Sequence, residues 1–132
     1  MVIQNYEAVM VDTSVWLAAF RGKFSEITER ARQLLQDDLA LTCGPVLFEI
    51  RRGLRAQEYK KTMDLMEALI FLPLADQDWE FAGNLDASLR ARGITIPPMD
   101  ALIAQVCLSN DVPIFTLDKH FETIKDLRIF RV

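Results

Sequence analysis

Apolar residues in the chain alternate between short continuous runs and longer stretches in which they recur every three or four positions. The short runs are typical of buried strands and the periodic stretches of amphipathic helices. The pattern predicts strands over 7–11, 39–43, 71–74, 112–117 and 127–132. It predicts helices over 14–20, 24–36, 45–54, 58–69, 76–91 and 99–110. This alternation predicts an α/β fold, a three-layer α/β/α sandwich with a mostly parallel central sheet.

Residues near the predicted helix ends support these boundaries. Ser14 is suited to cap the first helix, and Pro45 suits the first position of the third. The helix over 99–110 is apolar almost all round, so we expect it to be buried. The helix over 76–91 carries its apolar residues on one side, at Trp79, Ala82, Leu85 and Leu89.

The length and composition predict one globular domain, residues 1–132, because 132 residues suffice for one core but not for two ordinary ones. The longest apolar stretch, 68–75, is far too short to cross a bilayer, and we expect a cytoplasmic protein without a membrane segment. Cys43 and Cys107 lie in apolar contexts without metal-type spacing, which predicts buried free thiols.

The net charge of −4 argues against nucleic-acid binding through bulk electrostatics, which needs a positive face. A local basic stretch nevertheless lies in the middle of the chain, at Arg51, Arg52, Arg55, Lys60 and Lys61. It could contact a nucleic acid locally, and the alternative is an ordinary solvated helical face.

Four acidic residues are placed where they could meet. Asp12 and Asp118 follow two predicted strands, and the carboxyl ends of parallel strands share one edge of a sheet. Asp100 lies in the first turn of the buried helix. Glu49 falls about 60° outside the apolar arc of its own helix, so it flanks the buried stripe.

Each acid also has an ordinary structural explanation, as a turn residue, a helix-start charge, a loop cap or a solvated helix position. Together they are harder to explain, because two carboxylates about 5 Å apart repel by about 3 kcal/mol at an effective dielectric of about 20. Without a counter-ion, at least one should keep its proton. A site of oxygen ligands favours Mg²⁺ or Mn²⁺, and such a site suits metal-assisted hydrolysis of a phosphodiester.

Neutral and basic side chains accompany these acids. Thr13, Ser14 and Thr116 could hold water or a phosphate oxygen, and each could equally serve as a cap or turn residue. His120 is the lone histidine and follows Asp118 by two residues. It could contact phosphate or support a metal ligand, and plain loop chemistry is the alternative.

Four motifs in this order resemble the PIN domain, and within it the VapC-type toxins of toxin–antitoxin pairs. They are "VDTSVW" at 11–16, "FEIRRGL" at 48–54, "PPMDALIAQVC" at 97–107 and "TLDKHF" at 116–121. The resemblance covers nearly the whole chain. At the position of His120 many relatives carry Asp or Asn, so the chain departs from the family pattern there.

The resemblance carries over an acidic quartet, Asp12, Glu49, Asp100 and Asp118, as catalytic residues. It implies that Mg²⁺ or Mn²⁺ is held chiefly by Asp12 and Asp100, with the other two acting through water. It also implies an endoribonuclease that cleaves RNA with metal-activated water, is neutralised by a VapB-type antitoxin, and forms a homodimer or a toxin–antitoxin hetero-oligomer. The alternative is a non-catalytic PIN-like module that binds RNA or protein without cutting.

Overall fold

The central sheet has four parallel strands in the order β3-β2-β1-β4. The computed structural model describes residues 7–23 and 25–132. The strands are β1 (Val9–Val11), β2 (Ala40–Thr42), β3 (Ile70–Phe71) and β4 (Ile114–Phe115). From β1 the chain adds β2 and β3 on one side and later β4 on the other side. Ligands of α/β sheets bind in the crevice at the carboxyl ends of the two strands where the order changes side, here β1 and β4.

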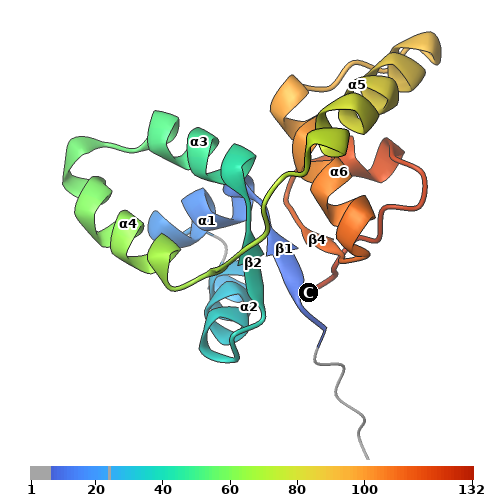
Figure 1. Ribbon diagram of the computed structural model, residues 1–132. Helices are drawn as coiled ribbons and strands as arrows, with labels where there is room; N and C mark the ends of the chain where they lie inside the picture. The colour runs from blue at the N-terminus through green and yellow to red at the C-terminus, as the bar shows by residue number, and fades with distance from the viewer. Residues whose placement is uncertain (1–6, 24) are drawn as a thin grey trace, which may run out of the picture.

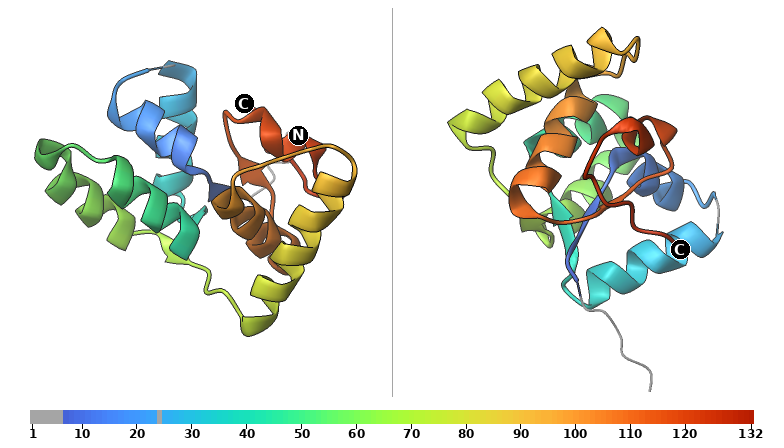
Figure 2. Two further views of the ribbon diagram at one scale, coloured as in Figure 1. Left: turned by 90° about the horizontal axis from the view of Figure 1, so that it is seen from above. Right: turned by 90° about the vertical axis from the view of Figure 1, so that its right-hand side faces the viewer.

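Helices cover both faces of this sheet. They are α1 (Thr13–Phe20), α2 (Ser25–Gln36), α3 (Gly44–Gly53), α4 (Tyr59–Glu67), α5 (Asp76–Ala91) and α6 (Pro98–Asn110), with 3-10 turns η1 (Ala56–Glu58) and η2 (Lys119–Thr123). Figure 1 shows α5 and α6 on one side of the strands and α1, α2 and α4 on the other. The two further views in Figure 2 show the same division. The three-layer sandwich predicted from the sequence is therefore confirmed.

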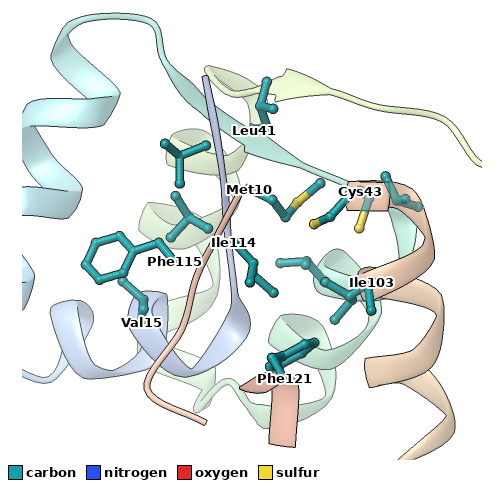
Figure 3. Packing of buried hydrophobic residues seen from close by; sticks show 14 of the residues in the cluster. Met10, Val15, Leu41, Cys43, Ile103, Ile114, Phe115 and Phe121 are labelled. Carbon is teal, nitrogen blue, oxygen red and sulfur yellow. The ribbon is translucent and has the colours of Figure 1, made fainter. Parts of the chain in front are cut away.

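The core lies on both sides of the short strands. Figure 3 shows Phe115 and Val15 on one side of β1 and β4, and Ile103 of α6 with Phe121 of η2 on the other. Cys43 and Cys107 are buried free thiols, as predicted. Residues 101–107 of α6 are all buried, which confirms that this helix is surrounded by the core.

Several predicted boundaries are wrong. Residues 127–132 form no strand, because this segment pairs with β4 only through one bridge between Ile114 and Ile129. The third strand covers Ile70–Phe71 rather than 71–74, since Pro73 has no N–H to donate to a ladder. The first helix begins at Thr13, so Ser14 lies inside its first turn and does not cap it. Phe24, where the prediction starts the second helix, lies outside the described residues.

The apolar side of α5 is also shorter than predicted. Ala82 and Leu89 are buried against the core, but Trp79 is 61% exposed. Asp86, on the same helix, forms an ion pair with Arg90 at 3.3 Å. Across the part of the chain that the structure describes, no helix combines the length and the hydropathy needed to span a membrane.

Candidate active site at the carboxyl ends of the strands

Asp12 connects β1, β4 and α1 through its backbone. Its N–H donates to the carbonyl of Phe115 at 2.9 Å, and its own carbonyl accepts from Val15 and Trp16 at 3.1 and 3.3 Å, which starts α1. The Asp12 side chain is buried. β1 can be followed by the buried carboxylate of Asp12 because neighbouring segments of the same chain donate hydrogen bonds to this carboxylate.

Two hydroxyl groups donate to one oxygen of that carboxylate. Ser14 Oγ and Thr116 Oγ1 each lie 2.8 Å from Asp12 Oδ2. The same hydroxyl oxygens accept backbone N–H groups from the loop after β4, Leu117 to Ser14 at 3.1 Å and Asp118 to Thr116 at 2.9 Å. The network orients Asp12 and fixes the start of the loop that carries Asp118.

Glu49 reaches the same region from α3. Thr13 Oγ1 donates to Glu49 Oε1 at 3.0 Å, which links the first turn of α1 to the middle of α3. Glu49 is half-buried, as expected for a residue that flanks the apolar stripe of its helix. The three hydroxyl residues predicted from the sequence therefore each donate a hydrogen bond to one of the predicted acids.

Asp100 is the third residue of α6, two positions after Pro98 starts the helix. It is only 5% exposed. Its Oδ2 is buried and accepts no hydrogen bond from any residue that the structure describes. A carboxylate oxygen buried in this way needs either a proton or a cation.

Asp118 and His120 complete the cluster from η2. Asp118 does not end a strand, since β4 stops at Phe115 and Asp118 precedes η2 as its N-terminal flanking residue. His120 Nδ1 lies 2.9 Å from Asp118 Oδ1 and 3.4 Å from Asp100 Oδ2. One ligand atom each of Asp100, Asp118 and His120 lie within 4.8 Å of one another, a spacing suited to a metal ion.

The electrostatics show that the four acids interact. Burial, and then the charges of Asp12, Glu49 and Asp118, raise the pKa of Asp100 to about 7, and His120 opposes the shift. Such a retained proton is expected when acids meet without a counter-ion. A bound divalent cation would take the place of that proton.

The pKa values of Asp12 and Glu49 are raised as well. Burial raises the pKa of Asp12, although the hydroxyls of Ser14 and Thr116 oppose it. Burial, followed by the charges of Asp12 and Asp118, also raises the pKa of Glu49, and the Thr13 hydroxyl and Arg52 oppose this shift. The acids thus form one electrostatic unit at the crevice between β1 and β4.

The molecule also has a hollow away from the acidic cluster. A groove of about 420 Å³ between α1, α2 and α4 is lined mainly by apolar side chains, including Trp16, Phe20, Leu35 and Leu65. None of the four acids lines it. Its apolar lining is unsuited to hold a phosphodiester, and we assign it no part in the chemistry of the acidic cluster.

Two features of the site could not be predicted from the sequence. His120 is expected near Asp118, but its imidazole also reaches Asp100. Thr116 connects Asp12 to the backbone of Asp118. The only available signal was the spacing of Thr116, Asp118 and His120 at alternate positions, which in an irregular loop gives no direction for the side chains.

A parallel α/β/α sandwich with an acidic cluster at the strand-order reversal defines the class of protein. Residues 9–127 match the family model of the PIN domain, and the chain belongs to that family.

Individual relatives are similar over nearly their whole length. The chain is 28% identical over 121 residues to ribonuclease VapC11 of Mycobacterium tuberculosis, covering 88% of this chain and 90% of that protein. Among solved structures, DNA-bound VapBC from Salmonella typhimurium is similar with a TM-score of 0.80 and 22% identity, covering 94% of this chain and 97% of that one. VapBC-5 from Mycobacterium tuberculosis, described as a member of a family of toxin–antitoxin systems, is similar with a TM-score of 0.68 and 24% identity, covering 95% and 98%.

Proposed function

We propose that this protein is a metal-dependent endoribonuclease of the cytoplasm, the toxin of a VapBC-like type II toxin–antitoxin pair. Asp12, Glu49, Asp100 and Asp118 are its catalytic residues. The main support for the proposal is the environment of Asp100. Its carboxylate is buried beside three other acids, and its Oδ2 accepts no hydrogen bond from any described residue. Membership of the PIN domain family and likeness to a protein named as a ribonuclease support the same activity.

The donor set fits a hard divalent cation, Mg²⁺ or Mn²⁺. Carboxylate oxygens are the ligands that these ions prefer, and Asp12 and Asp100 are the two most deeply buried of the four acids. These two residues would be its chief ligands, with Glu49 acting through water. When bound, the cation would neutralise the repelling carboxylates, lower the pKa of a water and stabilise charge on the phosphate.

The side chains of the cluster have separate tasks in this reaction. The hydroxyls of Ser14 and Thr116 hold Asp12 Oδ2, so that the carboxylate keeps one orientation while substrate binds. Thr13 holds Glu49 Oε1, which leaves Oε2 to take a proton from the attacking water.

The partners follow from the same assignment. RNA is the substrate, and the basic residues Arg51 and Arg52 of α3 are close along the helix to Glu49, where they can attract its phosphates. A VapB-type antitoxin is the inhibitor, in a homodimer or a toxin–antitoxin hetero-oligomer. Several solved structures similar to this chain are VapBC complexes, which supports such a partner.

Cleavage of total RNA with and without divalent cation tests the proposal. We expect the purified protein to cut RNA with Mg²⁺ or Mn²⁺ and to lose cleavage on chelation. Asp12→Asn and Asp100→Asn should lose cleavage by two or more orders of magnitude, while Asp64→Asn, an exposed acid of α4, should not. Cleavage that survives both chelation and Asp12→Asn would assign the activity to a contaminant or to another site.

A further inference from the structure

His120 is held at the acidic cluster by its own turn of chain. Its neighbour Phe121 is completely buried and anchors η2 in the core. Thr123 Oγ1 donates to the carbonyl of His120 at 2.6 Å, which fixes the backbone on the other side. The imidazole is 46% exposed, so its position results from the backbone and from the acids it faces.

The distances around the imidazole match those between ligands of one cation. His120 Nδ1 lies 2.9 Å from Asp118 Oδ1 and 3.4 Å from Asp100 Oδ2. Two ligands at right angles on an octahedral ion with bonds of about 2.1 Å are about 3.0 Å apart. A tetrahedral arrangement with similar bonds separates them by about 3.4 Å. The three atoms can therefore share one ion with little movement.

Asp100 provides a second, independent indication of a ligand. Its Oδ2 is buried, accepts no hydrogen bond within the described residues, and faces His120 Nδ1. A simple hydrogen bond from the imidazole to Asp118 leaves this oxygen with the 3.4 Å contact to His120 Nδ1 but with no hydrogen bond. A cation between the three side chains would satisfy it.

We propose that His120 is a nitrogen ligand which, with the carboxylates of Asp100 and Asp118, makes the site favour Mn²⁺ over Mg²⁺. Imidazole nitrogen binds first-row transition ions better than it binds Mg²⁺, whose preferred ligands are oxygens. The inference rests on the proposed function, because it concerns the cation that the acidic cluster would use. It deepens that function by assigning one ligand and one metal preference.

A spectroscopic measurement on the Mn²⁺-loaded, untagged chain tests the ligand directly. The sequence has a single histidine, so any directly bound imidazole belongs to His120. We expect electron spin-echo modulation from ¹⁴N, which changes to the ¹⁵N pattern when histidine alone is ¹⁵N-labelled. The modulation should vanish in His120→Gln and persist in Glu122→Gln, a control on the same turn whose carboxylate pairs with Arg131.

Metal affinities test the preference. By calorimetry we expect His120→Gln to weaken Mn²⁺ at least about tenfold, the scale on which even supporting groups act in metal sites, and to leave Mg²⁺ nearly unchanged. Mn²⁺ that binds without ¹⁴N modulation would overturn the inference and leave the proposed function intact, as would equal losses for both ions. Failure of the chain to bind any divalent cation would overturn both.

Discussion

The surroundings of Asp100 oppose a negative charge on its side chain. It is buried at the start of α6, and three other carboxylates act on it. Its Oδ2 lacks a hydrogen-bond donor among the described residues. A core position of this kind would be served better for stability by a neutral residue. The charge is therefore expected to serve binding rather than folding.

Replacing Asp100 with Asn should stabilise the metal-free protein. The pKa of this carboxyl is 3.8 ordinarily and about 7 in the folded chain, so the folded state binds the extra proton between these values. Stability of the wild type should therefore fall as pH rises from about 4 to 7. In chelator at pH 8, Asp100→Asn should raise the free energy of unfolding on the order of 2 kcal/mol, with a smaller gain at pH 5.

Calorimetric melting of both proteins at the two pH values measures this effect. Asp64→Asn provides the matched control, since Asp64 is exposed on α4. A loss of stability at pH 8, or an equal change at both pH values, would show that Asp100 is not held in a repulsive cluster.

Thr116 connects two of the acids, and Thr116→Val should uncouple them. The substitution removes the hydroxyl that donates to Asp12 Oδ2 and accepts from the N–H of Asp118. We expect the free energy of unfolding to fall by about 1–2 kcal/mol, the pKa of Asp12 to rise further, and RNA cleavage to slow. Denaturant unfolding and cleavage rates test this, with Thr95→Val in an exposed loop as control. Unchanged cleavage would mean that Asp12 does not need this orientation.

At the scale of elements, the site depends on where one strand ends and where two helical elements begin. β1 ends before Asp12, α6 begins just before Asp100, and η2 begins just after Asp118. The sequence predicts the first two well, because an apolar run and a buried helix give strong patterns. The sequence misplaces the start of η2. The predicted strand runs up to Asp118, but β4 ends at Phe115, and the N–H of Asp118 donates to the hydroxyl of Thr116.

The helix α3 carries both an acid of the cluster and exposed basic residues. Arg51 and Arg52 follow Glu49 on this helix, and Arg52 contacts the ring of exposed Phe48. Reversing both charges, Arg51→Glu with Arg52→Glu, should weaken RNA binding about tenfold or more at low salt and reduce its salt dependence. The control, Lys23→Glu with Arg32→Glu, makes the same change in net charge outside α3. If both double variants weakened RNA binding equally, the basic residues of α3 would contribute only through the net charge of the protein.

At the scale of the whole molecule, the fold brings together residues that are distant in sequence. Asp12 and Thr116 are 104 positions apart, yet their side chains are hydrogen-bonded. The alternation of strands and helices predicts this meeting, because the carboxyl ends of parallel strands share one edge. The pattern of strands and helices does not predict the side-chain rotamers of the site. The contact of His120 with Asp100 and the bare oxygen of Asp100 depend on tertiary packing around Phe121, which periodicity does not describe.

We expect the acids at this edge of the sheet to hold a divalent cation. Anomalous diffraction from crystals grown or soaked with Mn²⁺ tests it most directly. We predict a strong peak about 2.0–2.3 Å from carboxylate oxygens that include Asp100, absent from crystals of Asp100→Asn. A well-ordered wild-type site with no peak at saturating Mn²⁺, or a peak that avoids Asp12, Asp100 and Asp118, would contradict the claim.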